Sequence, residues 1–424
     1  MQLVTRVGNV LIDVLKKELE RIDSTKTSKR FENVIDSFTT LEGYAPRAVI
    51  KGKSYAIFNS NDYLGLRFHE RLRKAEEEAS KQFGAGPGAV RFISGTLKIH
   101  RDLEEYLAGF HSRDDAIIFS SAFAVNMAVI HCFIKGQSKD SLVTGDTLVI
   151  SDELNHRSII DGIRVAGLPK EQRAVFRHLD INDLQRILES NKGRFKRVLI
   201  ITDGVFSMIG EIQDIGKMQN VARRYQDFHQ EGVVTIVDDA HGIGVLGTGR
   251  GAEEVTKGRC DLLIGTMGKA LGVDGGYVVG DQLFIDYLRE SAATYIYSNP
   301  ISPGTAGASL ESLKIIDSSE GQSLLTRLRE NIEYFKEKVL KVGLRFVTDS
   351  SHPIQPILIG EPRKTRDLVT MLFEDGILVT NISYPVVPKG KDEIRVQLSA
   401  SHTKNDIDDF IEKIRKAATT LGLI

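Results

Sequence analysis

The stretch that decides the fold is Asp261–Gly280, DLLIGTMGKALGVDGGYVVG. It begins with the apolar run Leu262–Ile264, which is typical of a buried strand. Glycines then surround one lysine, Lys269, and glycine lets the backbone approach a bound group closely. A lone lysine in this setting, three residues after Thr266, suits a Schiff-base lysine beside a phosphate-bearing cofactor. The alternative is a tight turn with a solvated lysine, and this stretch alone does not decide between the two.

Composition excludes several classes of protein. The 424 residues include 56 Lys and Arg against 57 Asp and Glu, so no global positive field indicates a nucleic-acid partner. The two cysteines, Cys132 and Cys260, cannot build a disulfide framework or a cysteine-rich zinc site. The first 23 residues indicate an amphipathic helix rather than a signal peptide. No uncharged apolar stretch approaches about 18 residues, so we expect a cytoplasmic protein without membrane contact.

Short apolar runs alternate with helical patterns through the middle of the chain. Each run ends in polar residues or glycine before a helix begins, which indicates a mostly parallel sheet buried on both faces. In such sheets, ligands bind beyond the carboxyl ends of the strands. The predicted strands are Ala116–Phe119, Leu148–Ser151, Ala174–Arg177, Arg197–Thr202, Val233–Val237 and Leu262–Ile264, and the helices between them include 122–132, 156–165 and 181–190.

The chain changes character near Pro303. A helix at 308–316 and a more charged one at 324–342 precede short strands at 345–347, 355–359 and 393–398, and a closing helix is expected over 406–421. We therefore predict an α/β fold in three parts. These are an N-terminal helix and arm over residues 1–60, a large cofactor-binding domain over 61–302, and a smaller α+β domain over 303–424.

Two ionisable side chains follow the strand Val233–Val237. Asp238 at that strand end could pair with a pyridinium nitrogen, which would keep the ring cationic and able to accept electrons. His241, three residues later, could hydrogen-bond the phenolic oxygen of the same ring. An aspartate and a histidine this close also suit a metal ion, but no second histidine or cysteine cluster supports one, and we predict no metal.

Other positions become candidates by their place after predicted strands. His156 could lie flat on an aromatic cofactor, although a lone histidine at a helix start is often a surface group. Ser207 could reach the phenolic oxygen, or be an ordinary loop serine. The helix beginning at Ala122 offers free backbone N–H groups and the positive end of its dipole to a phosphate. Ser298 and Asn299 could add donors to that phosphate, from a partner subunit if one is present.

Arg395 lies within a strand pattern of the last part of the chain. Its guanidinium could bind a substrate carboxylate with two hydrogen bonds, or form a salt bridge on a half-exposed strand.

Two motifs of nucleotide-binding proteins do not fit this sequence. The glycine-rich run 84–96 neither follows a strand nor opens a helix, so it is not a dinucleotide-binding loop, and we interpret it as a packed loop. The residues around Lys269 also lack the spacing of a Walker-A loop.

Several motifs together resemble a known family. They are NDYLGL at 61–66, SDELNHRSIIDG at 151–162, DGVFSM at 203–208, VDDAHG at 237–242 and GTMGKALG at 265–272. In this order they are similar to the α-oxoamine synthases, which are fold-type-I enzymes that depend on pyridoxal 5′-phosphate (PLP). The resemblance runs from about Phe31 to the end of the chain.

The resemblance implies a role for each matched residue. Lys269 would bond PLP and move the substrate proton, and Asp238 would face the ring nitrogen. His241 and Ser207 would contact the ring oxygen, and His156 would stack on the ring. The phosphate would be held by Ala122, Phe123 and Thr266, with Ser298 and Asn299 of a second subunit in a homodimer. Asn61 and Arg395 would bind the carboxylate of the amino acid.

Within the family, VRFISGT at 90–96, YPVVPKG at 384–390 and RVQLSASHT at 395–403 resemble glycine C-acetyltransferase most. That resemblance predicts the condensation of glycine with acetyl-CoA to give 2-amino-3-oxobutyrate and CoA. The alternatives are an 8-amino-7-oxononanoate synthase, which joins alanine to a long acyl-CoA with decarboxylation, and a non-catalytic scaffold of the same fold. The link 134–147 looks longer than in relatives, and we expect it near the cofactor, where it would alter the acyl-CoA entrance.

Overall fold

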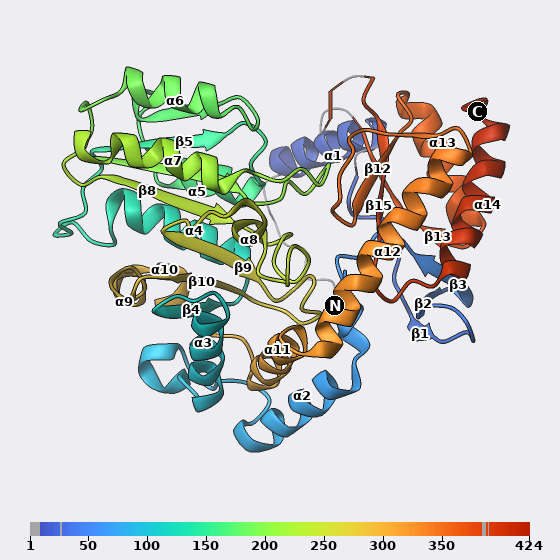
Figure 1. Cartoon of the computed structure of the whole chain (residues 1–424), viewed down its shortest axis with the longest axis horizontal. Coiled ribbons are helices and arrows are strands. Elements are labelled where there is room, and N and C mark those ends of the chain that lie inside the picture. Colours follow the sequence, from blue (N-terminus) through green and yellow to red (C-terminus); the bar gives the residue numbers. More distant parts are fainter. Residues whose placement is uncertain (1–8, 26–27, 384–386, 389) are drawn as a thin grey trace.

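The computed structural model describes residues 9–25, 28–383, 387–388 and 390–424. Figure 1 shows a large sheet with its helices on one side of the molecule and the C-terminal unit on the other. The first eight residues of the predicted N-terminal helix and most of the YPVVPKG motif lie outside the described residues. In the described part, no helix is long and apolar enough to cross a membrane.

The central sheet of the described chain has seven strands in the order β4-β10-β9-β8-β7-β5-β6. Only β10 runs antiparallel to its neighbours β4 and β9, and the other pairs are parallel. The prediction of a mostly parallel sheet is therefore confirmed. The antiparallel strand β10 was not predicted, because it lies within the glycine-rich stretch Asp261–Gly280. The strands are β4 (Asp115–Phe119), β5 (Thr147–Asp152), β6 (Arg173–Phe176), β7 (Arg197–Asp203), β8 (Val233–Asp238), β9 (Leu262–Thr266) and β10 (Gly276–Gly280).

Alternate residues of these strands pack on opposite faces, so both faces of the sheet are buried. Ile200 of β7 belongs to the core that includes α6 (Ile181–Ser190) and α7 (Ile215–Tyr225). Its neighbour Ile201 belongs to the core that includes α4 (Ala122–Lys135) and α5 (Arg157–Val165). The remaining helices around the sheet are α3 (Lys98–Phe110), α8 (Ala252–Thr256), α9 (Gln282–Ser291) and α10 (Ala293–Ile296), with short helical turns at Leu66–Phe68, Lys170–Gln172 and Gln226–Phe228.

The C-terminal unit contains a four-stranded antiparallel sheet in the order β11-β12-β15-β14, built from described residues. Its strands are β11 (Arg345–Phe346), β12 (Ile354–Leu358), β14 (Thr380–Ile382) and β15 (Glu393–Gln397). The long helices α12 (Ser319–Lys341), α13 (Pro362–Glu374) and α14 (Lys404–Thr420) lie on this side of the molecule in Figure 1.

The N-terminal arm joins the C-terminal unit through a mixed sheet. Strands β1 (Ser37–Thr39), β2 (Arg47–Ile50) and β3 (Lys53–Ile57) are antiparallel, and β13 (Ile377–Leu378) pairs with β3 in parallel. Conversely, α11 (Pro303–Ile316) packs on α2 (Glu70–Phe83) beside the large sheet, where a Cβ on Gly307 would meet the carbonyl of Ala75 at 2.8 Å. Each of the two units is therefore built from segments that lie far apart in the sequence.

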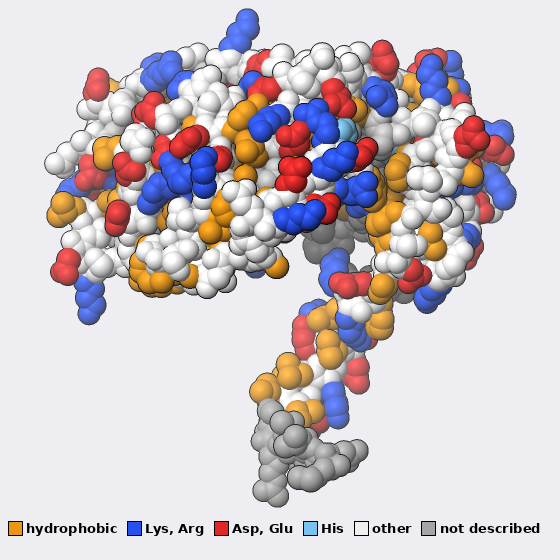
Figure 2. Space-filling model, turned by 90° about the horizontal axis from the view of Figure 1, so that it is seen from below, with side chains coloured by type: hydrophobic (Ala, Val, Ile, Leu, Met, Phe, Trp, Pro, Cys, Tyr) orange, Lys and Arg blue, Asp and Glu red, His pale blue; other side chains and the backbone are white. Residues whose placement is uncertain are grey.

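Helix α1 (Asn9–Ser24) extends away from the body of the molecule (Figure 2). Its apolar side chains Val10, Leu11, Val14 and Leu15 are more than half exposed. Apolar residues at helical spacing normally cover a neighbouring surface, so this stripe is available to a second chain.

Two loops differ in detail from the sequence-based interpretation. The packed loop at 84–96 contains a π-helical turn, Arg91–Gly95, in which the buried Arg91 binds Glu104 through two 3.0 Å contacts. The prediction that the link 134–147 lies near the cofactor is wrong. Helix α4 begins at the edge where the parallel strands end and returns to the opposite edge, so the link lies where β5 begins, beside Arg197 at the start of β7.

Candidate active site

Three strand ends carry the polar side chains of the site. Asp203 ends β7, Asp238 ends β8 and Thr266 ends β9. Asp203 and Asp238 are register partners on neighbouring parallel strands, so both lie at the carboxyl edge of the sheet. The topology therefore brings together residues that are far apart in sequence, at the edge where parallel sheets bind ligands.

A pocket at this edge collects most of the predicted site residues. Its lining comes from the start of α4, the loops after β5, β7 and β8, and the glycine-rich turn after β9. The predicted residues in the lining are Ala122, Phe123, His156, Ser207, Asp238, His241 and Lys269, and they are joined by Ser158, Asp203, Val205 and Ala240. No group of three or more metal-binding side chains is found in the described chain.

A chain of buried hydrogen bonds holds Asp238. One carboxylate oxygen, Oδ2, accepts from Asn126 Nδ2 at 2.5 Å, and Oδ1 accepts from the backbone N–H of Ala240 at 3.1 Å. Asn126 Nδ2 also lies 2.9 Å from Ser158 Oγ, which is 2.7 Å from His156 Nδ1. These contacts orient the carboxylate and the imidazole toward the same pocket.

Asp203 is a second buried acid beside Asp238. Its Oδ2 accepts the backbone N–H of His156 at 2.9 Å, which anchors the start of α5. Burial, followed by the charge of Asp238, raises the pKa of Asp203 well above its usual value. Burial also lowers the pKa of His156, which favours the neutral imidazole at this position.

His241 is held by a tyrosine from the N-terminal part of the chain. The hydroxyl of the fully buried Tyr63 lies 2.8 Å from His241 Nδ1, and the carbonyl of His241 accepts from His352 Nε2 at 2.8 Å. Burial, followed by the charge of Lys269, lowers the pKa of His241 well below its usual value. With Nδ1 occupied by Tyr63, Nε2 is the ring nitrogen free to meet a ligand in the pocket.

Lys269 follows β9 in a tight turn. The N–H of Gly272, at φ 72°, donates to the carbonyl of Lys269 at 2.9 Å, and glycine adopts such a positive φ without strain. Burial lowers the pKa of Lys269, and the nearby charge of Asp238 opposes part of that shift. A lysine with a lowered pKa is neutral more often, and only the neutral amine can act as a nucleophile or base.

The start of α4 forms a small-residue cradle. Ser121 caps the helix by accepting the N–H of Ala124 at 3.2 Å, which leaves the N–H groups of Ala122 and Phe123 without a partner in the described chain. Gly276 of β10 lies directly against this turn, because a Cβ there would sit 2.2 Å from the nitrogen of Ala122. Such a helix start, reached closely by backbone, suits a phosphate group.

Three predicted residues lie beside the pocket rather than in its lining. They are Thr266 and the two candidates for binding the substrate carboxylate, Asn61 and Arg395. Thr266 Oγ1 donates to the carbonyl of Gly275 at 2.9 Å and accepts the N–H of Gly268 at 3.1 Å. Arg395, on β15, donates from Nη1 to the carbonyl of Ser207 at 2.7 Å. This contact links the C-terminal unit to the wall of the pocket.

Asn61 and Arg395 are connected through one glutamine. Arg395 Nη2 donates to Gln397 Oε1 at 3.2 Å, and Gln397 Nε2 donates to Asn61 Oδ1 at 2.5 Å. The Nε of Arg395 is buried with no partner in the described chain. An unpaired guanidinium nitrogen beside the pocket is available to a ligand.

Ser298 and Asn299 are not brought into the pocket of this chain. They lie between α10 and α11 in an exposed segment, where Ser298 Oγ donates to the carbonyl of Asn299 at 3.4 Å. Sequence reasoning also missed Asn126, Asp203 and Tyr63 as site residues. Asp203 had a signal, since it closes its strand as Asp238 does, but Asn126 and Tyr63 reach the site only through tertiary contacts.

Comparison with known proteins identifies the family. A family model for class I and II aminotransferases matches residues 54–414. The chain belongs to that family. It is similar to an 8-amino-7-oxononanoate synthase of Thermosipho melanesiensis, with 42% identity over 379 residues that cover 89% of this chain and 91% of that protein. A second 8-amino-7-oxononanoate synthase, of Bacillus velezensis, is 39% identical over 415 residues, covering 97% and 99%.

A solved structure shows the same fold. A serine palmitoyltransferase of S. paucimobilis, with PLP–myriocin bound, superposes with a TM-score of 0.83 at 24% identity and covers 100% of both chains. The family match and this fold confirm the predicted fold-type-I architecture, and the family match confirms PLP as the cofactor. The predicted α-oxoamine synthase type is confirmed by the relatives.

The prediction of glycine C-acetyltransferase activity is wrong. The relatives at 36 to 42% identity over most of the chain carry the name 8-amino-7-oxononanoate synthase, which was the stated alternative. The prediction rests on the likeness of the motifs at 90–96, 384–390 and 395–403 to one member of the family, and not on the acyl pocket itself. Substrate choice depends on the shape of the acyl pocket, which those motifs do not encode.

Proposed function

We propose that the chain is an 8-amino-7-oxononanoate synthase, an acyltransferase that joins alanine to a long acyl-CoA and releases CO₂ and CoA. The names of the relatives support this substrate class. The observation that carries the enzyme assignment is the meeting of Lys269, Asp238 and His241 in one pocket at the carboxyl ends of the strands. A scaffold without catalysis has no physical need to keep a base, an acid and a phosphate cradle together.

The product name defines the acyl group. In 8-amino-7-oxononanoate the amino-bearing carbon and the terminal methyl correspond to alanine without its carboxylate. The remaining carbons, ending in the carboxylate, correspond to a dicarboxylic acid bound to CoA through one end. The new carbon–carbon bond therefore joins the alanine α-carbon to the thioester carbonyl, the thiolate of CoA leaves, and the carboxylate of alanine is lost as CO₂.

The residues of the pocket fit PLP. The unpartnered N–H groups of Ala122 and Phe123, together with Thr266, would hold the phosphate. The buried Asp238 would hold the proton on the ring nitrogen, and His156 would cover one face of the ring. When bound, PLP supplies a cationic ring that accepts the electron pair left at the α-carbon of the amino acid.

The same side chains position the ring oxygen and the substrate. His241 Nε2 and Ser207 Oγ would hydrogen-bond the ring oxygen, because Tyr63 occupies the other nitrogen of His241. Lys269, with its lowered pKa, would bond the aldehyde of PLP and then take and return the proton at the α-carbon of alanine. Arg395 and Asn61 would orient the alanine carboxylate.

A homodimer would complete the site. Ser298 and Asn299 lie outside the pocket of their own chain, and they would reach the phosphate of a neighbouring subunit. The exposed apolar stripe of α1 offers a surface for that neighbour.

The location of the protein in the cytoplasm remains a prediction.

Release of CoA with matched substrate pairs tests the proposed function. The purified holoenzyme is assayed with alanine or glycine against acetyl-CoA and the dicarboxylic acyl-CoA described above, and products are identified by mass. We expect the highest kcat/KM for alanine with the long acyl-CoA, with one CO₂ per CoA. Equal or higher turnover of glycine with acetyl-CoA would refute the assignment, and a purified protein that takes up no PLP would favour the scaffold alternative.

A further inference from the structure

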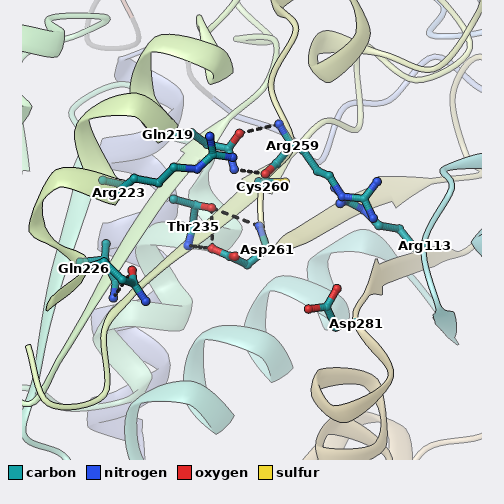
Figure 3. Close-up of a pocket in the computed structure, with 11 residues that line it drawn as sticks. Arg113, Gln219, Arg223, Gln226, Thr235, Arg259, Cys260, Asp261 and Asp281 are labelled. Atoms are coloured by element: carbon teal, nitrogen blue, oxygen red, sulfur yellow. Dashed lines mark hydrogen bonds between the residues drawn. The ribbon is translucent and has the colours of Figure 1, made fainter.

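A second cavity lies at the opposite edge of the large sheet from the PLP pocket. Figure 3 shows the residues that line it. The cavity has a volume of about 310 Å³, which is in the range of small-molecule sites. Its walls come from α7, the start of β8, the segment before β9 and the residues that flank β4 and β10. Val233 in its lining and Asp238 in the PLP pocket are the two ends of β8, about 17 Å apart at ~3.3 Å per residue.

Three arginines line this cavity with much of their donor capacity unused. The exposed side chain of Arg223, on α7, has no hydrogen bond or ion pair to the described chain, and the exposed side chain of Arg259 donates only from Nη2, to the carbonyl of Ser112 at 2.9 Å. Arg113 is buried and pairs with Glu253 at 2.7 Å, yet its Nε has no partner in the described chain. A buried donor without an acceptor is costly, as at Arg113 Nε, and the exposed guanidinium groups of Arg223 and Arg259 add further donors, so the cavity favours a ligand rich in acceptor oxygens.

The backbone of Arg259 is held rigidly. Both groups of the Gln219 side-chain amide bind it: Oε1 accepts the N–H of Arg259 at 2.6 Å, and Nε2 donates to its carbonyl. Figure 3 shows these two bonds tying α7 to the segment that carries Arg259. The fixed backbone limits the positions beside the cavity that the exposed Arg259 guanidinium can reach.

The two acids of the lining are placed differently from the arginines. Asp261 Oδ2 accepts from the N–H and the hydroxyl of Thr235, at 2.6 and 2.7 Å. These two bonds fix the Asp261 carboxylate against β8. Asp281 lies exposed on a separate wall, away from the arginine side chains in Figure 3. A carboxylate there would repel the anionic end of a ligand but accept hydrogen bonds from hydroxyl groups at the other end.

We propose that this cavity binds a phosphate-bearing small molecule that also carries hydroxyl groups. Its phosphate lies between Arg223 and Arg259, within reach of Arg113 Nε, because planar guanidinium groups match phosphate oxygens in pairs. Its hydroxyl groups face Asp281. The site is separate from the PLP pocket and takes no part in the reaction proposed above.

Calorimetric titration of the PLP-loaded enzyme tests the proposal, with pyrophosphate and AMP as probes. PLP occupies the catalytic phosphate cradle in this form of the protein. We expect one AMP per chain, and a loss of affinity of about ten-fold or more in Arg223→Gln and in Arg259→Gln. Arg224→Gln is the matched control, because Arg224 is the next residue of α7, pairs with Asn220 and Gln185, and lies outside the cavity lining.

One further measurement separates the two ends of this site. Asp281→Asn should change the affinity for AMP and pyrophosphate in opposite directions, since only AMP offers hydroxyl donors to the carboxylate. The proposal is overturned if neither probe binds, or if the Arg223→Gln, Arg259→Gln and Arg224→Gln variants bind AMP alike.

Discussion

Replacing Arg395 tests how the substrate carboxylate is held. Nη1 of the guanidinium donates to the carbonyl of Ser207, and Nη2 donates to Gln397. Its buried Nε has no partner in the described chain. A carboxylate bound there gains at least one charge-assisted hydrogen bond, each of which contributes about 1.5–3 kcal/mol. At ~1.4 kcal/mol per factor of ten, Arg395→Ala should raise the KM for alanine about 10- to 150-fold.

The assay separates this effect from general damage to the site. Steady-state kinetics give KM values for alanine and for the acyl-CoA, and PLP affinity is measured alongside because Arg395 also touches Ser207. Arg395→Lys keeps the charge without the planar fork and should fall between wild type and alanine variant. Arg363→Ala, at an 88% exposed arginine of the same unit, is the control. A KM for alanine within about two-fold of wild type in Arg395→Ala would remove Arg395 from carboxylate binding.

Three further predictions follow from buried groups and the exposed helix. Tyr63→Phe removes the partner of His241 Nδ1 and should cost about 1–3 kcal/mol in unfolding free energy or in kcat/KM, whereas unchanged kinetics and an unchanged PLP spectrum would exclude a positioning role. Burial raises the pKa of Glu393 to about 8, so the folded chain keeps a proton that the unfolded chain loses above about pH 4.5. The free energy of unfolding should therefore fall between about pH 5 and 8, by at most ~1.4 kcal/mol per pH unit. Urea titrations at several pH values measure this slope, and Glu393→Gln should flatten it. An unchanged slope in the variant contradicts the assigned burial of Glu393. Leu11→Glu should weaken self-association measured by analytical ultracentrifugation, and a dimer of unaltered affinity would show that α1 does not pack on a second chain.

Local sequence patterns could predict the central sheet and the strand ends that carry the chemistry. A short apolar run marks each parallel strand. Asp238 ends one of these strands, and Lys269 lies three residues after the end of another. Their meeting follows from parallel topology, because the carboxyl ends of parallel strands share one edge. The sequence therefore contained enough to place the core of the pocket.

Long-range contacts could not be predicted in the same way. Nothing local shows that Asn126 binds Asp238, that Tyr63 holds His241, or that β13 completes the sheet of the N-terminal arm. The error over the link 134–147 has a different cause. Because α4 starts at the carboxyl edge and runs antiparallel to the strands, its end must lie at the other edge, and this follows from topology rather than from any motif.

The central claim is that Lys269 bonds PLP while Asp238 holds the ring nitrogen. Borohydride reduction of the PLP-loaded enzyme, followed by peptide mass spectrometry, measures the first half of it directly. The account predicts a single PLP adduct on Lys269, no adduct in Lys269→Ala, and a PLP absorption spectrum that changes in Asp238→Asn. An adduct on another lysine, or wild-type absorption retained in Lys269→Ala, would contradict it.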